Sequence, residues 1–545
     1  MNGAATLSPA AARPGYLGGE GRFRGLAGWL FSTDHKRVAV LYAFSTLAFF
    51  LVGAALGFLL RTQELVPDGA LTKDANVYNA AFTVHGAIMI FLFIIPAIPG
   101  IFGNFFLPLM IGAEDVAFPR LNLATWWLYA TGAVMLISSL FWGGGLPDTG
   151  WTFYAPYSLK THTNVPMAVM AVFVLGMSSI VSGLNFIVTI HRLRAPGMRW
   201  MNMPLFPWAI YATSWVQVLA TPVLGITVLL IFAERIFHVG IFNPAMGGDP
   251  LLYQHLFWMY SHPAVYIMIL PAMGVISEVI PTFAHRAIFG YKAIVWSSMG
   301  IAFLGSLVWA HHMFTSGMSD VAGLVFSLLT YLVAVPSAIK VFNWTATLYK
   351  GSIAMEPPML FALSFVFLFS IGGLTGLVIG ALAVNVMLHD TYFIVAHFHY
   401  TMFGGAGFGL FAALHYWFPK MTGRMYSRAV AYASWGLLFF GFNLLYFTMF
   451  ILGVMGMPRR YAFYLPKFQV GHIIATVGAW VMVTGILIMF GNLVMALRRG
   501  PKAPDNPWGG VTLEWQTSSP PPVENFSAPP KVPENPYDFT GVPIP

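Results

Sequence analysis

The most restrictive feature of this chain is a series of twelve apolar stretches, each long enough to cross a lipid bilayer. They lie near residues 38–60, 81–109, 123–142, 162–190, 208–232, 255–282, 291–310, 319–343, 358–385, 391–417, 429–453 and 470–497. A spanning helix needs about 20 apolar residues. Backbone polar groups in lipid must be satisfied within the segment, so we expect helices. The short alternating strands of a β-barrel are absent from the sequence. The pattern predicts an all-α integral membrane protein, a bundle of twelve transmembrane helices.

Composition and charge placement agree with this fold class. The chain is 58% hydrophobic and only 8% charged, whereas soluble domains carry about 25% charged residues. With the amino terminus inside, the inner loops hold 18 lysines and arginines and the outer loops hold 7. The positive-inside rule therefore predicts cytoplasmic termini. The net charge of +8 needs no nucleic-acid partner.

The chain divides into three parts by composition. Residues 1–37 form a polar inner-side segment, and residues 38–499 form the membrane domain. Residues 500–545 contain twelve prolines and no apolar run, so we expect an inner-side tail that lies extended on the surface or against a partner. No cleavable signal peptide is expected within residues 1–28. The absence of cysteine places any thiolate-bound cofactor on another subunit.

Six histidines stand inside otherwise apolar segments. They are His85, His262, His311, His312, His397 and His399. Imidazoles at bilayer depth normally face a cavity, a partner or a metal, so the set indicates a buried redox metal centre. His397 and His399 are about 200° apart around a helix and must serve different metals. His85 could complete a bis-imidazole iron with either one, which leaves the other for a second iron.

His262, His311 and His312 form a second group. Adjacent residues are about 100° apart, so His311 and His312 converge only near a helix end, which the following MFTSGM supplies. Three imidazoles suit copper or zinc. Tyr266 is one helical turn from His262, where a phenol could donate an electron and a proton. The alternative for Tyr266 is an ordinary buried tyrosine.

The other histidines carry weaker signals. His389 and Asp390 could bind a hard cation or accept a proton, although a helix cap explains Asp390 almost as well. Three histidines flank basic loops and are expected to be solvated: His35, His191 and His285. Structural roles are expected for His162, His238, His255, His415 and His472.

Several sequence blocks together resemble one family. They are FTVHG, GNFFLPLMIGAEDVAFPR, WMYSHPAVYI, VWAHHMFTSGM, LHDTYFIVAHFHY, MPRRY and, in the tail, NPWGGVTLEWQTSSPPP. In order and spacing they are similar to subunit I of the haem–copper oxidases, of the cytochrome c oxidase type. The resemblance implies a terminal respiratory oxidase in the inner membrane of an aerobic bacterium. Such an enzyme reduces O2 to water with electrons from cytochrome c and translocates protons.

The resemblance also implies cofactors, partners and ligands. The cofactors are two haems, expected to be a-type, one copper ion and a magnesium ion at a subunit interface. The partners are a subunit II carrying a dinuclear copper site and further membrane subunits such as subunit III. The family's metal ligands match His85 and His399 for the low-spin haem, His397 for the high-spin haem, and His262, His311 and His312 for copper. Tyr266 matches the tyrosine linked covalently to His262.

Further site residues follow from the same resemblance. Arg459 and Arg460 match residues that pair with haem propionates, which suits two arginines in an outer loop. Trp151 matches a residue near the propionates, and Arg61 one near the formyl group of the low-spin haem. His389 and Asp390 match the magnesium site.

Two proton routes are implied. Asn104, Asp115 and Asn122 match the family's proton-uptake motif; the alternative is a loop carboxylate paired with Arg120. A second route matches Lys340, Ser337 and Ser277. The alternative for Lys340 is a lysine that snorkels to the surface.

One position departs from many relatives. Where they carry a glutamate as the proton branching point, this chain has Ala264. Tyr260 lies one turn earlier on the same helix face, and Ser261 adds a hydroxyl. A branch of the family carries this Tyr-Ser pattern, and we expect Tyr260 and Ser261 to relay protons and to preserve pumping.

Three other functions remain to be weighed. A quinol oxidase would carry polar groups where we place Val52, Leu56, Val77 and Ala80, so cytochrome c is favoured. A nitric oxide reductase would lack the pair formed by His262 and Tyr266. A twelve-helix transporter would use broken helices and no cofactor, and the purified protein would be colourless.

Overall fold

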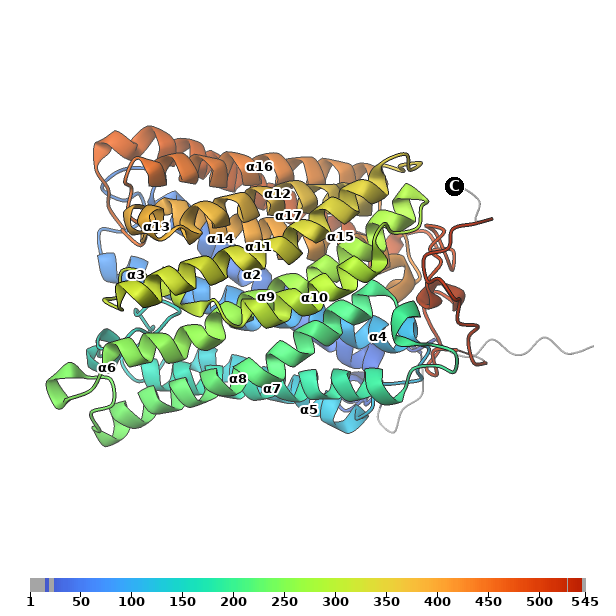
Figure 1. The fold of residues 1–545 in the computed structure, drawn as a ribbon, viewed down its shortest axis with the longest axis horizontal. Helices are drawn as coiled ribbons and strands as arrows, with labels where there is room; N and C mark the ends of the chain where they lie inside the picture. Colours follow the sequence, from blue (N-terminus) through green and yellow to red (C-terminus); the bar gives the residue numbers. More distant parts are fainter. Residues whose placement is uncertain (1–14, 19–23, 527, 542–545) are drawn as a thin grey trace, which may run out of the picture.

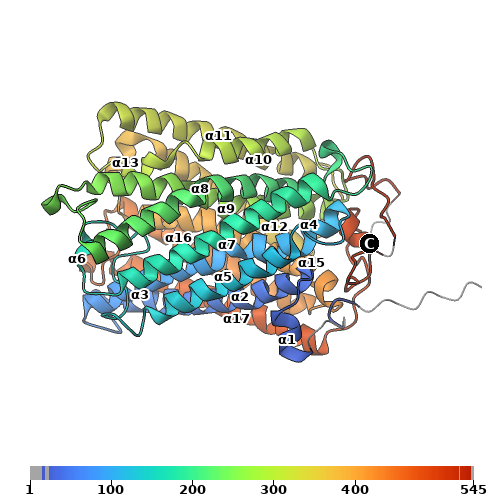
Figure 2. The same cartoon turned by 90° about the horizontal axis from the view of Figure 1, so that it is seen from below.

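A computed structural model describes residues 15–18, 24–526 and 528–541 (Figure 1). Arg13 and Arg22 of the amino-terminal segment lie outside these ranges. Within them the chain forms helices joined by loops, with isolated β-bridges and no strand. The long helices run side by side along the longest axis of the molecule (Figures 1 and 2). The expected all-α membrane bundle is confirmed.

The first half of the bundle contains nine α-helices and two π-helical segments. Their bounds are α1 (Gly25–Leu30), α2 (His35–Gln63), α3 (Ala75–Ala87), η1 (Ile88–Ile94), η2 (Ala97–Gly103), α4 (Asn104–Ile111), α5 (Pro119–Ser138), α6 (Tyr157–Lys160), α7 (Val165–Arg192), α8 (Leu205–Phe237) and α9 (Pro250–Ala284). Short 3₁₀ turns are η3 (Trp200–Asn202) and η4 (Pro244–Met246).

The second half follows the same plan. Its α-helices are α10 (Tyr291–Gly305), α11 (Asp320–Leu348), α12 (Pro357–Gly380), α13 (Leu382–Leu388), α14 (Tyr392–Thr401), α15 (Phe408–Thr422), α16 (Arg428–Val454) and α17 (Gln469–Arg499). A π-helical segment, η6 (Met402–Gly407), joins α14 to α15. The 3₁₀ turns are η5 (Trp309–Met313), η7 (Pro466–Phe468) and η8 (Leu513–Gln516).

Ten helices of the described chain are long and apolar enough to span a membrane. The other two predicted stretches are helical but interrupted. Predicted segment 291–310 ends its α-helix at Gly305 and continues as 3₁₀ turn η5. Predicted segment 391–417 changes to π-helix over the glycine-rich MFGGAG, a kind of insertion that often marks functional sites.

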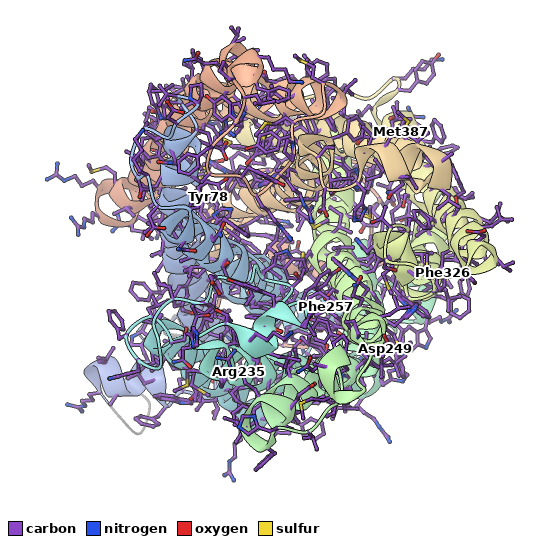
Figure 3. All side chains as sticks on the ribbon, turned by 90° about the vertical axis from the view of Figure 1, so that its left-hand side faces the viewer. Tyr78, Arg235, Asp249, Phe257, Phe326 and Met387 are labelled. Carbon is purple, nitrogen blue, oxygen red and sulfur yellow. The ribbon has the colours of Figure 1, made fainter. Side chains whose placement is uncertain are left out.

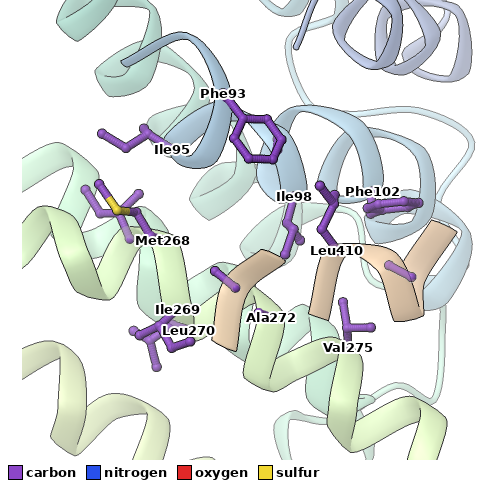
Figure 4. Close-up of a cluster of buried hydrophobic side chains, with 14 of the residues drawn as sticks. Phe93, Ile95, Ile98, Phe102, Met268, Ile269, Leu270, Ala272, Val275 and Leu410 are labelled. Carbon is purple, nitrogen blue, oxygen red and sulfur yellow. The ribbon is translucent and has the colours of Figure 1, made fainter. Parts of the chain in front are cut away.

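Helix α9 lies at the centre of the bundle. Its most apolar window is 89% buried, compared with at most 50% for any other spanning helix. Met268 and Ala272 face η1, η2 and the η6–α15 segment in a close-packed apolar cluster (Figure 4). Because α9 carries both His262 and Tyr266, this packing holds the candidate site away from lipid.

The carboxy-terminal tail covers one end of the bundle (Figure 1). It forms turns, bends and the 3₁₀ turn η8, and it buries Trp508, Trp515 and Tyr537 against the helix ends. The Trp508 indole donates to the Tyr416 carbonyl at 2.9 Å. Helix α1 lies at the same end (Figure 2), so both described chain ends share one side of the molecule.

Candidate metal centres

Three imidazoles converge beside the middle of α9. The ligand nitrogens of His262, His311 and His312 all lie within 4.8 Å of one another. His311 and His312 stand on the 3₁₀ turn η5, just after α10 ends, which is the helix end that the spacing required. The described residues offer no carboxylate or thiolate to this group. An all-imidazole donor set fits copper or zinc.

Neighbouring side chains orient these rings. The Thr330 hydroxyl donates to the Phe326 carbonyl and therefore accepts the Nδ1 proton of His311 at 2.8 Å. The Nε2 atom of His311 is left free to bind a metal. Trp258 stacks on His312 with ring centroids 3.8 Å apart. Nδ1 of His262 lies 3.0 Å from Nε2 of His312, whereas Nε2 of His262 is buried without a hydrogen-bond partner among the described residues.

Tyr266 lies against this cluster. Its ring centroid is 4.9 Å from that of His262. The position depends on Gly305, because a Cβ there would overlap the Tyr266 ring. Sequence reasoning missed this glycine, since nothing in the local sequence shows that α10 passes so close to α9.

The three remaining candidate ligands also present a bare nitrogen. Nδ1 of His85 donates to the Gly53 carbonyl at 2.8 Å, and Nδ1 of His399 donates to the Val395 carbonyl at 2.9 Å. Nδ1 of His397 donates to the Thr375 hydroxyl at 3.2 Å. In each neutral ring Nε2 is then available as a metal ligand.

The placement of these rings separates two groups. His399 lies within electrostatic range of His85, and His397 lies within range of His262 and His311. The side chains of His85, His397 and His399 are only half-buried although they stand inside the bundle. The side chains therefore leave space around Nε2 that a large planar group could fill.

Glycines admit two of these rings. A Cβ at Gly57 would lie 3.1 Å from the His85 ring, and a Cβ at Gly376 would lie 3.1 Å from the His397 ring. Gly86, next to His85, likewise lets Trp151 approach, because a Cβ there would lie 3.3 Å from the tryptophan side chain. Glycines on α2, α3 and α12 thus let these side chains approach the neighbouring helices.

Charged side chains gather at the end of the bundle opposite the tail, which faces the viewer in Figure 3. Asp390 pairs with Arg459 at 2.9 Å, and Nε2 of His389 lies 3.7 Å from its other oxygen. Thr391, not Asp390, caps α14, so the capping alternative is wrong. Burial lowers the pKa of Arg460 to about 10, which indicates a guanidinium in need of an anionic partner.

Arg61 lies in a buried polar cluster at the end of α2. It forms an ion pair with Glu64 and contacts Nδ1 of His472 at 3.2 Å. The Tyr78 hydroxyl donates to Glu64 at 2.5 Å. Burial opposes ionisation of Glu64, but Arg61, His472 and Tyr78 together hold its pKa down at about 2. Sequence reasoning missed Glu64, which lies only one turn beyond Arg61.

Asp115 lies in the loop between α4 and α5. It forms no ion pair with Arg120 in the described chain, so that alternative is not supported. Its carboxylate accepts the Val116 amide proton at 2.6 Å, and burial raises the pKa of Asp115 to about 7. Nearby, the buried polar atoms Oδ1 of Asn104 and Nδ2 of Asn122 have no described partner.

A line of hydroxyl groups leads inward from this loop. Thr125 donates to the Asn122 carbonyl at 2.7 Å, and the Tyr42 hydroxyl donates to Thr125 at 3.1 Å. Tyr42 and Ser178, 3.3 Å apart, line a cavity between α2, α5, α7 and α8. Sequence reasoning missed these residues, although the serines at 178 and 182 recur at helical spacing on an apolar helix.

Beyond the cavity, α8 and α9 bring further polar groups together. Gln217 lines its wall. Side-chain oxygens of Gln217, Thr221 and Ser261 are buried without a described hydrogen-bond partner. Tyr260 is buried beside them at 3% exposure. Groups of this kind in a protein interior generally bind ordered water.

Lys340 stands well inside α11 and is 1% exposed, so it does not snorkel to the surface. Its ammonium donates to the Ser298 hydroxyl of α10 at 2.7 Å. The expected companions have other partners: Ser337 donates to Val333, and Ser277 accepts from Trp344 at 3.0 Å. Ser298 was missed because its helix pairing is not visible in the sequence.

Comparison with known proteins decides the family. The profile described as "Cytochrome C and Quinol oxidase polypeptide I" matches residues 37–481. The chain belongs to this family. Its haem–copper chemistry accounts for the buried imidazoles, and membership makes the chain a catalytic subunit of a membrane-bound oxidase with haem and copper cofactors.

Individual relatives support the same family assignment. Cytochrome c oxidase subunit 1 of Thermostichus vulcanus is 45% identical over 510 residues, covering 93% of this chain and 92% of the relative. The subunit of the same name from Cereibacter sphaeroides is 40% identical over 537 residues, with 92% and 95% covered. A solved haem–copper terminal oxidase dimer superposes with a TM-score of 0.74 at 21% identity, covering 87% of this chain and 85% of that one. This solved structure is similar to the chain in its fold.

Proposed function

We propose that this chain is the catalytic subunit of a cytochrome c oxidase that reduces O2 to water and translocates protons. The observation that carries the proposal is the convergence of His262, His311 and His312 beside Tyr266 and opposite His397. In a family that uses haem and copper, this arrangement supplies one copper position facing one haem position. Purified enzyme is expected to contain two haems and one such copper per chain.

The ligand assignment is based on the Nε2 atoms that remain available when Nδ1 of each ring is hydrogen-bonded. His85 and His399 hold the low-spin haem iron, and His397 holds the high-spin haem iron. When bound, the haems and the copper supply electron transfer and the reduction of O2. The protein fixes each ring through Nδ1, excludes bulk water with apolar helices, and keeps Tyr266 within reach as a donor of a proton and an electron.

The outer groups complete the haem environment. Among the described residues Arg460 has no acidic partner of its own, and Arg459 shares Asp390, so both suit haem propionates, with Trp151 alongside. Arg61 matches a family residue near the formyl group of the low-spin haem, so we expect a-type haems. His389 and Asp390 contribute to a magnesium site shared with a partner subunit.

Two routes bring protons from the tail side. The first begins at Asp115, Asn104 and Asn122 and follows the cavity between α2, α5, α7 and α8. The second passes Lys340, with Ser298 as its direct hydrogen-bond partner and Ser337 and Ser277 nearby. The first route is supported by buried polar groups that lack partners in the described chain and by the cavity, and the second by the burial of Lys340 and its hydrogen bond to Ser298.

The first route ends near Tyr260 and Ser261, in the branch of the family that lacks the glutamate at Ala264. The oxygens of Gln217 and Ser261, which have no described partner, support a hydrated relay there. Tyr260→Phe should strongly reduce turnover or proton yield, whereas Ala264→Ser should leave both near wild type. Unchanged pumping in Tyr260→Phe would reject the relay.

The electron donor and assembly follow the relatives. The relatives from Thermostichus vulcanus and Cereibacter sphaeroides both bear the name cytochrome c oxidase, which disfavours a quinol oxidase. A subunit II carries the dinuclear copper site, since this chain lacks cysteine, and further subunits such as subunit III complete the complex. The tail side faces the cytoplasm, with the bundle in the inner membrane of an aerobic bacterium.

The deciding experiment is analysis of extracted haem together with copper quantification on the purified complex. We expect two haems of a-type per chain. The copper total should exceed that of the dinuclear site by one ion. A folded complex without porphyrin would overturn the proposal, and oxidation of quinol but not cytochrome c would favour the alternative donor.

A further inference from the structure

A tail residue reaches the mouth of the first proton route. Asn525 is completely buried although it is 26 residues beyond the last helix (525 − 499). Its side-chain amide donates to the carbonyls of Ala113 at 2.8 Å and Glu114 at 3.1 Å. These are the two peptide groups that precede Asp115. The tail therefore fixes the loop that carries this carboxyl group.

The same side chain also holds the charged group that faces the loop. The Lys36 ammonium donates to Oδ1 of Asn525 at 2.8 Å and to the Val523 carbonyl at 2.9 Å. It pairs with Asp34 at 3.2 Å. Lys36 is fully buried, which is costly for an ammonium unless it is paired and hydrogen-bonded. Asn525 thus links the Asp115 loop to the start of α2.

His35 completes the cluster and corrects an expectation. The sequence indicated a solvated histidine, but His35 is fully buried because the tail covers it. Its Nδ1 donates to the Asn104 carbonyl at 2.7 Å, so Nε2 of the neutral ring accepts from Lys36 or from the Asn525 amide, which lies 3.0 Å away. Asn104 belongs to the same proton-uptake motif as Asp115.

We propose that Asn525 is a positioning residue for proton uptake, through which the carboxy-terminal tail forms one wall of the mouth at Asp115. The proposal rests on the proposed role of Asp115 as the residue that takes up protons. Asn525 does not carry protons itself. It keeps the Asp115 loop closed against bulk water and holds Lys36 in place beneath it.

The local backbone supports this role. Asn525 has a φ of +64°, a left-handed conformation that asparagine adopts more readily than most residues. The tail therefore places an amide side chain in a bend where few other side chains fit. Without that amide, two loop carbonyls would lose a hydrogen-bond donor and the buried ammonium would lose one of its acceptors, and water would have to enter to solvate them.

The electrostatic consequence has a definite sign. Burial is the largest influence on Asp115 and raises its pKa, while Asp34 raises it further and Lys36 lowers it. The negative charge of Glu524 favours the charged form of the Lys36 ammonium group. Opening the mouth to water would weaken the effect of burial. The pKa of Asp115 should then fall toward the ordinary aspartate value, so that the carboxyl group loses its proton at lower pH.

The test compares Asn525→Gly with Asn506→Gly in the purified complete complex. Glycine adopts a positive φ without strain, so the first variant removes the amide alone. Asn506 is a matched control in the same tail, because within the described chain its side chain bonds only to Gly510. Turnover is measured between pH 5.5 and 9, with hydrogen–deuterium exchange of peptides covering residues 112–118.

We expect the alkaline limb of turnover in Asn525→Gly to move to lower pH by about one unit, a tenfold change in the protonated fraction at a given pH. Exchange of residues 112–118 should rise, and both measurements should stay at wild type in Asn506→Gly. Asn525→Asp, of equal size but unable to donate to the two carbonyls, should also raise the exchange. The Asn525→Asp variant provides the test if Asn525→Gly fails to assemble into the complex.

Asp115→Asn separates this inference from the proposed function. If Asp115→Asn impairs turnover but Asn525→Gly leaves the pH profile and the exchange unchanged, Asn525 is not a positioning residue. If Asp115→Asn itself leaves turnover and proton uptake unchanged, the proposed route fails instead. Equal shifts in both glycine variants would show a general effect of the tail and would overturn the assignment to Asn525.

Discussion

Nδ1 of His262 and Nε2 of His312 lie 3.0 Å apart in the centre of the bundle. They come from α9 and from the 3₁₀ turn η5, separated by 50 residues in the chain. Both nitrogens would be ligands of a copper ion bound by the three imidazoles.

Loss of one imidazole from this cluster should remove copper but not haem. We expect His312→Ala to lower the copper content by about one ion per chain and turnover by at least about 10²-fold, because two imidazoles bind far more weakly than three. Metal analysis and the haem absorption spectrum measure the two effects. His191→Ala, at an exposed position, is the control; full copper in His312→Ala would refute the site.

Gly305→Ala tests the placement of Tyr266. The added methyl group would overlap the tyrosine ring, and such overpacking costs about 1–3 kcal/mol. We expect haem and copper to remain bound while turnover falls, because the phenol is displaced from His262. Gly373→Ala places its Cβ in open space and should behave as wild type; equal turnover in both variants would contradict the prediction.

Glu64→Gln tests the buried ion pair with Arg61. Removing one partner of such a pair leaves an uncompensated charge and costs about 3–5 kcal/mol, so the midpoint of thermal denaturation should fall. Because the pKa of Glu64 is lowered to about 2, its stabilisation is present above pH 4.5 and is lost as the pH falls toward 2.

The pH dependence of thermal stability in the two proteins provides the matching control. Between pH 4.5 and 2 the wild type should lose stability faster than Glu64→Gln, which has no carboxyl group to titrate at this position. Thermal midpoints followed through haem absorbance would measure both proteins. Parallel curves would show that Glu64 does not stabilise Arg61.

Lys340→Met tests the second proton route. Methionine fills similar volume without an ammonium, and loss of a positioned proton carrier typically costs about 10²-fold or more in rate. We expect turnover to collapse while both haems and copper remain. Ser298→Ala should give a smaller decrease, since it removes only the hydrogen-bond partner of Lys340. Wild-type turnover in Lys340→Met would exclude the route.

Much of the architecture follows from local sequence. Long apolar runs require helices because lipid offers no other hydrogen-bond partners for the backbone, and the periodicity of His397 and His399 already places them on opposite sides of one helix. The tail lacks apolar runs, and it accordingly forms no spanning segment in its described part. These properties depend on residues within a few turns of one another.

Other features could not be predicted because they depend on which helices become neighbours. Ser298 meets Lys340 and Gly305 admits Tyr266 only because α10 packs beside both α9 and α11. Local sequence could not show that Thr391 caps α14 in place of Asp390, or that Asp390 pairs with Arg459.

The sequence by itself determined a membrane-embedded helical oxidase subunit and the six histidines that are the candidate ligands of its metal centres. Only the tertiary structure decided which imidazoles meet, and that His35 is buried beneath Asn525 rather than exposed to water. The physical reason is that hydropathy and helical periodicity act over a few residues, whereas a contact across 490 residues exists only after the bundle and its tail have packed.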